Sequence, residues 1–106
     1  TEHFGPVAPV VPYSDEAEVI ELANDTEYGL AAAVQSTDLA QAERIASAIE
    51  AGSVHINDQP INEEPHIPFG GAKDSGLGKF HGEQSIEMLT ETKWVSVQRD
   101  DRRYPL

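Results

Sequence analysis

The chain has 106 residues, 39% of them hydrophobic, which suits one domain with a modest core. Its 19 acidic residues outnumber 7 basic ones, and the formal net charge of -12 argues against nucleic acid and anionic membranes as partners, because both need a basic surface. The lack of cysteine excludes disulfides, thiolate metal sites and cysteine nucleophiles within the chain. It has no apolar run of about 18 residues and no signal-peptide pattern, so we expect a soluble cytoplasmic protein.

The first segments in chain order alternate between strand-like and helix-like patterns. Residues 7–13 are apolar and β-branched, but two prolines interrupt them, which predicts an edge or irregular strand. Ser14 is a candidate N-cap for a helix over 14–24, whose apolar residues recur at helical spacing. The continuous apolar run at 30–34 predicts a buried strand.

A second helix and a further strand follow. Ser36 or Thr37 is expected to cap this helix, which carries an apolar stripe over 39–49. Gly52 is expected to form its left-handed C-terminal cap, and 53–57 is the next strand. The order strand, helix, strand, helix, strand predicts an α/β fold with crossover units on a largely parallel sheet.

The second half of the chain has fewer regular segments. Residues 58–68 form a polar loop with two prolines, and a glycine-rich bend occupies 70–79. A short helix is expected at 83–89 and a last strand at 93–98, followed by a charged tail. The sequence has no internal repeat and no domain linker, so we expect residues 1–106 to form a single unit.

The glycine-rich bend first suggests a phosphate-binding loop, but it fails both known patterns. In the P-loop pattern Lys73 would stand where the first glycine belongs, and Phe80 where serine or threonine belongs. In the dinucleotide-binding pattern His81 replaces the third glycine. The glycines are therefore expected to let backbone segments pass closely, which a side chain would prevent.

No complete catalytic or metal-binding pattern is visible. The four histidines lack metal-site spacing, and a solvated loop explains Glu63, Glu64 and His66 better than a chelating site does. Ser75 and Ser85 are not surrounded by the Gly-x-Ser-x-Gly sequence of a serine hydrolase. We therefore expect neither a bound metal nor a catalytic residue in this chain.

Five short motifs are spread along nearly the whole chain. They are Glu-x-Phe-Gly-Pro-Val at 2–7, Asn-x-x-x-Tyr-Gly-Leu-Ala-Ala-x-Val at 24–34, Ala-Gly-x-Val-x-x-Asn at 51–57, Pro-Phe-Gly-Gly-x-Lys-x-Ser-Gly-x-Gly at 68–78 and Thr-Glu-x-Lys at 90–93. In this order and spacing they resemble the C-terminal region of the NAD(P)-dependent aldehyde dehydrogenase superfamily. The stretch 57–66 is moreover similar to the branch that oxidises aromatic aldehydes such as benzaldehyde, salicylaldehyde or vanillin.

The resemblance implies a reaction that this chain lacks the groups to perform. In the family a cysteine thiolate attacks the aldehyde, hydride passes to the nicotinamide, and a glutamate activates water to release the acid. The resemblance also implies that Glu2 hydrogen-bonds the ribose hydroxyls of NAD or NADP and that Phe4 packs near the nicotinamide. The family's cysteine and the strand-turn-helix that carries the cofactor's pyrophosphate have no counterpart in this chain. We therefore carry over no catalytic residue, and we expect no complete cofactor domain and no cofactor bound to this chain alone.

Two further regions gain a role from the resemblance. The loop from Asp58 to Phe69 corresponds to one wall of the aldehyde pocket, and the residues expected to face substrate are Ile61, His66, Ile67 and Phe69. The strand at 93–98 corresponds to the family's oligomerisation strand, which joins a sheet across a subunit interface, so we expect a homo-oligomer.

Three interpretations follow. In the first, the chain is the C-terminal fragment of a full-length aldehyde dehydrogenase and is inactive alone. In the second, it is a stand-alone, non-catalytic remnant that pairs strands with complete subunits. In the third, it is an unrelated small domain whose glycine bend binds an anion, although the net charge of -12 disfavours anions.

The first interpretation generates a test of association. Without the surfaces that would cover residues 7–11 and 93–98, the isolated chain should dimerise or exchange strands, because unpaired apolar strand edges seek partners. Sedimentation velocity at high protein concentration measures this directly. A monodisperse monomer would contradict the prediction.

Overall fold

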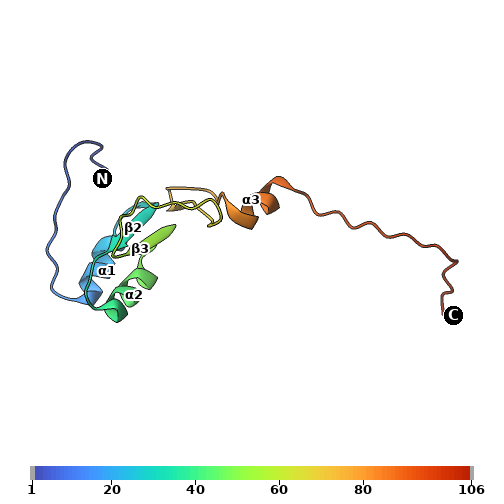
Figure 1. Ribbon diagram of the computed structural model, residues 1–106, viewed down its shortest axis with the longest axis horizontal. Coiled ribbons are helices and arrows are strands. Elements are labelled where there is room, and N and C mark those ends of the chain that lie inside the picture. Colours follow the sequence, from blue (N-terminus) through green and yellow to red (C-terminus); the bar gives the residue numbers. More distant parts are fainter. Residues whose placement is uncertain (1, 106) are drawn as a thin grey trace.

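The computed structural model describes residues 2–105 and has an elongated shape, with extents of 74 × 31 × 24 Å. Most helices and strands gather at one end, and the last residues form an extended arm that reaches away from them (Figure 1). The elements are α1 (Glu16–Asn24), β1 (Tyr28–Gly29), β2 (Ala31–Val34), α2 (Leu39–Ala48), β3 (Ser53–Ile56), β4 (Ala72–Lys73) and α3 (Gly82–Leu89).

The centre of the fold is one parallel crossover unit, β2-α2-β3. The strands pair in parallel from Ala31 opposite Ser53 to Val34 opposite Ile56, and α2 packs against both. The apolar stripe predicted for this helix is confirmed in part: Ala42 is fully buried and Ile45 is 8% exposed, whereas Leu39, in the first turn, is 59% exposed. The predicted α/β crossover architecture is therefore confirmed in this unit, whose sheet contains the two strands β2 and β3. The prediction that the strand at 30–34 is buried is wrong: Leu30 is 46% exposed and no residue of β2 is fully buried, because a two-stranded sheet has few neighbours to cover it.

Both N-terminal helices begin one or two residues later than predicted. The N-cap of α1 is Asp15, not Ser14: its carboxylate accepts from the Glu18 N–H at 2.9 Å, while the Glu18 carboxylate accepts from the Ser14 N–H at 2.7 Å. The N-cap of α2 is Asp38, not Ser36 or Thr37. In each case a carboxylate next to the first turn replaces a hydroxyl as the cap, because it bonds the free N–H groups and also carries the negative charge that a helix N-terminus favours.

A bidentate ion pair ties α1 to α2. The Arg44 guanidinium donates to both carboxylate oxygens of Glu16, at 3.0 and 2.9 Å. The hydrogen bond and charge of Arg44 lower the pKa of the Glu16 carboxyl below its usual value. The pair is exposed to solvent, so its contribution is small and weakens in salt.

The role predicted for Gly52 is wrong. Helix α2 ends at Ala48 and its C-cap is Ile49, whose backbone is extended; among residues 2–105 the positive-φ glycine is Gly82, not Gly52. Gly52 is required for a different reason: a Cβ there would overlap the carbonyl oxygen of Gly70. The glycine-rich bend thus passes directly against the start of β3, as expected for a close backbone approach.

The bend is also paired with the segment before β2. Strand β4 runs antiparallel to β1, with Tyr28 opposite Lys73 and Gly29 opposite Ala72. Residues 70–79 therefore lie beside the crossover unit, although they are far from β1 in the sequence. The helix predicted at 83–89 is present as α3, one residue longer at its start.

Two predicted strands do not form in the described chain. Residues 7–13 and 93–98 are extended but pair with no strand in the part of the chain that the structure covers. Pro9 and Pro12 remove two donors from the first segment, and the second lies on the arm, away from any strand edge (Figure 1). Trp94 is 91% exposed there. The role of 93–98 in oligomerisation stays a prediction.

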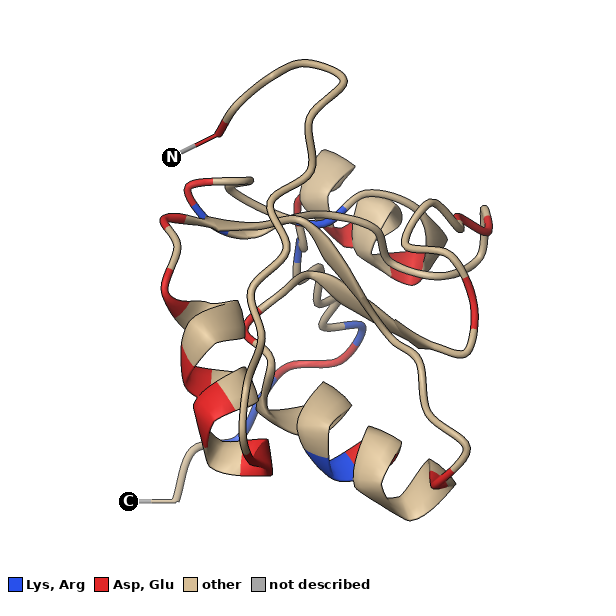
Figure 2. Ribbon diagram, turned by 90° about the vertical axis from the view of Figure 1, so that its left-hand side faces the viewer, with Lys and Arg blue, Asp and Glu red and all other residues tan. Residues whose placement is uncertain are grey.

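The acidic excess is spread over the surface of the folded end. Figure 2 shows acidic positions on helices and loops, with few basic positions between them. No helix within residues 2–105 is long and apolar enough to cross a membrane.

The contact between Gly52 and Gly70 gives a stability prediction. Gly52→Ala should lower the free energy of unfolding by about 1–3 kcal/mol, because the added methyl forces two backbone segments apart. Gly5→Ala is the control, since its Cβ would have nothing within 4 Å, and should change stability by less than about 0.5 kcal/mol. Urea denaturation followed by circular dichroism measures both. Equal midpoints would contradict the prediction.

Candidate functional site

The loop predicted as a pocket wall begins at an asparagine that holds the ends of two strands together. Asn57 has a φ of 57°. Its amide donates to the Ser36 carbonyl at 2.9 Å and accepts from the Ser36 N–H at 2.9 Å. The Gln35 side chain also donates to the Asp58 carbonyl, at 2.8 Å. These bonds fix the start of the loop at the carboxyl ends of β2 and β3. Ligands bind at the carboxyl ends of the strands in open α/β sheets.

The four predicted wall residues lie in this loop with different exposures. Ile61 is 84% and Ile67 52% exposed, and the His66 side chain is 72% exposed. Phe69 is half-buried and lines an apolar hollow of about 280 Å³ with Gly70, Phe80 and Met88. The structure thus puts one member, Phe69, against a hollow and leaves the other three open to solvent.

The far end of the loop is held by the residues that lead into α3. The backbones of Phe69 and Phe80 exchange two hydrogen bonds, of 2.8 and 2.7 Å. The Gly82 N–H donates to the Pro65 carbonyl at 3.2 Å. The His81 ring stacks on Phe69, with centroids 6.3 Å apart and planes at 27°. A long proline-containing loop is therefore tied at both ends.

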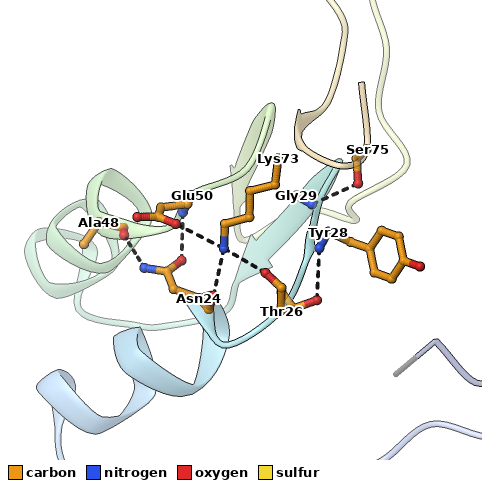
Figure 3. A network of polar contacts seen from close by, with 8 residues as sticks. All are labelled: Asn24, Thr26, Tyr28, Gly29, Ala48, Glu50, Lys73 and Ser75. Carbon is orange, nitrogen blue, oxygen red and sulfur yellow. Dashed lines mark hydrogen bonds and ion pairs between the residues drawn. The ribbon is translucent and has the colours of Figure 1, made fainter. Parts of the chain in front are cut away.

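Lys73 connects this region to the crossover unit through a network of polar contacts (Figure 3). Its ammonium donates to the carbonyls of Asn24 at 2.8 Å and Thr26 at 3.1 Å, and lies 3.1 Å from a Glu50 carboxylate oxygen. Helix α1 has no basic residue in its last turn. Lys73 thus supplies, from 49 residues away, the cation that a helix C-terminus favours.

Asn24 completes the network by joining the ends of the two helices. Its side-chain amide donates to the Ala48 carbonyl at 2.9 Å and accepts from the Glu50 N–H at 2.8 Å (Figure 3). These bonds satisfy backbone groups that a helix end leaves free. Two of the motif residues that carry the family resemblance, Asn24 and Lys73, are therefore structural.

Ser75 and Lys79 act in the same way. The Ser75 hydroxyl accepts from the Gly29 N–H at 2.9 Å (Figure 3). The Lys79 ammonium donates to the carbonyls of Gly52 at 3.0 Å and Gly70 at 2.8 Å. Three polar side chains of the glycine-rich bend, Lys73, Ser75 and Lys79, thus bond backbone groups of neighbouring segments, in line with the predicted close backbone passage.

The two predicted cofactor residues lie on the N-terminal stretch. Glu2 lines an open hollow of about 420 Å³, together with Tyr28, Glu50 and Ser75. Phe4 has a φ of 49° and is 89% exposed. The structure places Glu2 beside the start of β2 and leaves Phe4 in solvent. In residues 2–105 there is no group of three His, Asp or Glu side chains placed to hold a metal ion.

His81 is the site residue that sequence reasoning missed. It appeared only as the residue that breaks a glycine pattern, yet it has a φ of 70° and a ψ of 165°, a region that is nearly restricted to glycine and costs roughly 1–3 kcal/mol for other residues. The available signal was its position, directly before Gly82 and the start of a helix.

Comparison with known proteins decides the family. The family model described as "Aldehyde dehydrogenase family" matches residues 1–95. The chain belongs to the aldehyde dehydrogenase family. The predicted resemblance is therefore confirmed, and the α/β architecture of the chain is that of an aldehyde dehydrogenase segment.

Named relatives include enzymes of aromatic aldehydes. The chain is 50% identical over 106 residues to benzaldehyde dehydrogenase [NAD(+)] of Pseudomonas putida, covering 99% of this chain and 22% of that protein. It is 48% identical over 98 residues to vanillin dehydrogenase of Corynebacterium glutamicum, covering 92% and 20%. The chain thus spans about a fifth of the length of these relatives.

Solved structures of aldehyde dehydrogenases are similar to this chain. Salicylaldehyde dehydrogenase from Pseudomonas putida G7, complexed with salicylaldehyde, matches with a TM-score of 0.89 and 40% identity, over 100% of this chain and 22% of that one. Betaine aldehyde dehydrogenase from Staphylococcus aureus, in complex with NAD+, matches with a TM-score of 0.77 and 43% identity, over 83% and 17%.

The lysine network of this aldehyde dehydrogenase chain can be tested by truncating its charge. Lys73→Met should lower the free energy of unfolding by about 1–3 kcal/mol, because two carbonyls and a carboxylate lose their donor. Lys93→Met changes the net charge equally, but Lys93 lies exposed on the arm and should have little effect. Chemical denaturation compares the two variants. A Lys73→Met variant as stable as Lys93→Met would refute the assigned role.

Proposed function

We propose that this chain is the C-terminal part of a longer aldehyde dehydrogenase that oxidises an aromatic aldehyde to its acid with NAD or NADP. Three facts support the proposal: the chain spans 22% of the length of its benzaldehyde relative, that relative and others are named for aromatic aldehydes, and the chain has no cysteine. The family's reaction needs a thiolate nucleophile. The isolated chain should therefore be inactive.

The observation that carries the proposal is the loop held at both ends. Asn57 fixes its start at the strand ends, and the Phe69–Phe80 backbone pair fixes its return. Between them the loop presents Ile61, Ile67 and Phe69, which are apolar and suited to an aromatic ring. The predicted wall also includes His66, whose side chain is 72% exposed and pairs with Glu64 at 3.3 Å.

In the complete enzyme the preceding part of the chain would supply the nucleophile and most of the nucleotide site. When bound, NAD or NADP supplies the acceptor for the hydride. Glu2 fits a ribose diol, because a carboxylate can accept two hydrogen bonds and this one lines an open hollow. Phe4 supplies an exposed ring that would pack near the nicotinamide. Both residues would position the cofactor, which is the work that a hydride transfer requires of the protein.

The exposed arm favours association between subunits as part of this function. Trp94, Val95 and Val97 are 91%, 73% and 76% exposed, on a segment that pairs with no strand in the described part of the chain. We propose that 93–98 pairs with a sheet of another subunit, which makes the enzyme a homo-oligomer. The same arm supports the second candidate, a non-catalytic module that pairs with complete subunits.

An activity comparison tests the proposal. The coding sequence upstream of Thr1 should continue in frame and encode a cysteine, and the protein from the complete frame should reduce NAD or NADP with benzaldehyde, salicylaldehyde or vanillin. The 106-residue chain alone should show no turnover. Glu2→Ala in the complete enzyme should raise KM for the cofactor about 10-fold or more, from the loss of charge-assisted hydrogen bonds.

Two outcomes would contradict the proposal. A start codon immediately before Thr1 would favour the non-catalytic module. A complete enzyme that turns over small aliphatic aldehydes but not aromatic ones would refute the aromatic substrate class while leaving the family unchanged.

A further inference from the structure

His81 has a backbone conformation that its residue type does not favour. With φ at 70° and ψ at 165° it lies in a region nearly restricted to glycine, and it forms no side-chain hydrogen bond to cap α3. The next residue, Gly82, also has a positive φ, of 58°. Strain of this kind persists only where surrounding contacts over-determine the conformation, so the contacts of His81 indicate what the strain serves.

Those contacts point to the loop predicted as the pocket wall. The imidazole Nδ1 lies 3.2 Å from a carboxylate oxygen of Glu63. It is buried, and it lacks the alignment of a full hydrogen bond with that oxygen. The other contact is the stack of the imidazole on the ring of Phe69. One side chain therefore touches the loop at two points, six residues apart.

The backbone on either side of His81 binds the same loop. Phe80 exchanges hydrogen bonds of 2.8 and 2.7 Å with Phe69, and the Gly82 N–H donates to the Pro65 carbonyl at 3.2 Å. A Cβ at Gly82 would lie 2.8 Å from the His66 carbonyl oxygen, so the loop sits tightly on this turn. The strained conformation lets three consecutive residues face the loop at once.

We propose that His81 is a positioning residue for aromatic substrates: it holds the Phe69 ring and the Glu63 segment, and so sets the shape of the pocket wall. The proposal rests on the proposed function, in which Phe69 belongs to that wall. His81 itself touches no substrate. It acts through the orientation of Phe69 and through the order of residues 61–69.

The chain contains a matched control in a second Glu–His pair. Glu64 and His66 lie 3.3 Å apart, with side chains 59% and 72% exposed, and both belong to the loop. That pair does not connect the loop to another element. The Glu63–His81 pair joins the loop to the turn before α3, with side chains 49% and 36% exposed. Removing the glutamate charge from each pair in turn distinguishes two effects. A general electrostatic effect would appear in both variants, whereas the loss of loop tethering would appear only when Glu63 is changed.

Two variants of the complete enzyme test the proposal. His81→Gly removes the side chain and also relieves the backbone strain, so its Tm should stay equal to or above that of the wild type. Its KM for an aromatic aldehyde such as vanillin should rise about 3- to 10-fold, with kcat retained, because uniform substrate binding is lost. Its KM for acetaldehyde, which is too small to need the Phe69 ring, should not change.

Glu63→Gln is the second variant, and it leaves the backbone of His81 untouched. It should raise KM for vanillin in the same direction, by about 2- to 5-fold, whereas Glu64→Gln should not. Amide hydrogen exchange of residues 61–69 should be faster in His81→Gly and Glu63→Gln than in the wild type and in Glu64→Gln. If His81 served only global stability, faster amide hydrogen exchange in residues 61–69 would be accompanied by a lower Tm. Faster exchange with an unchanged Tm therefore indicates a local role in ordering the loop.

The outcomes distinguish this inference from the proposed function. An unchanged KM for vanillin in both variants, or unchanged hydrogen exchange in the loop, would overturn the role of His81 while leaving aromatic oxidation intact. A wild-type enzyme without activity on aromatic aldehydes would refute the proposed substrate and, with it, the effect of His81 on aromatic KM. Faster exchange in the loop would then still show the tether.

Discussion

The contact between the backbones of Gly52 and Gly70 is the constraint on which the rest of the chain depends. A side chain at Gly52 would overlap the Gly70 carbonyl, and the Lys79 ammonium bonds the carbonyl oxygens of both glycines. The contact brings the glycine-rich bend against the first residue of β3. Because β4 lies in the same bend, it can pair with β1, and Lys73 then reaches the end of α1.

The strongly acidic surface follows in part from this arrangement. Three of the seven basic residues, Arg44, Lys73 and Lys79, bind carboxylates or carbonyls within the folded end. The remaining four, Lys93, Arg99, Arg102 and Arg103, follow α3 on the extended arm. The folded end therefore presents mostly acids to solvent (Figure 2). Its charge reflects the use of these three cations in contacts within the folded end.

The candidate site is a loop whose two ends are fixed by hydrogen bonds and whose apolar side chains are mostly exposed. Asn57 and the turn at 80–82 fix the two ends of the loop, while Ile61 and Ile67 remain exposed. Exposed apolar side chains grouped on one loop are typical of an interaction surface. The arm at 93–98 is similar, since its apolar side chains are exposed and its backbone pairs with no strand among residues 2–105.

The sequence by itself determined the local pattern and the family. Periodicity placed α2 and β3, turn residues placed the loop at 58–68, and the spacing of glycines excluded a phosphate loop, because each of these signals spans only a few residues. It could also name the candidate wall residues through the resemblance. It assigned the helix caps one or two residues early, because several neighbouring polar residues compete for each cap.

Only the tertiary structure decided which residues make the long-range contacts that position the candidate loop and the glycine-rich bend. Lys73 bonds a carbonyl 49 residues earlier, and His81 meets Glu63 across the loop. Contacts between distant residues depend on how the whole chain folds, so no local pattern encodes them. The same reason explains why residues 7–13 and 93–98 are predicted as strands but form none. Strand propensity is a property of one segment, whereas a strand also needs the edge of a neighbouring strand to pair with. In the part of the chain that the structure describes, neither segment lies beside such an edge.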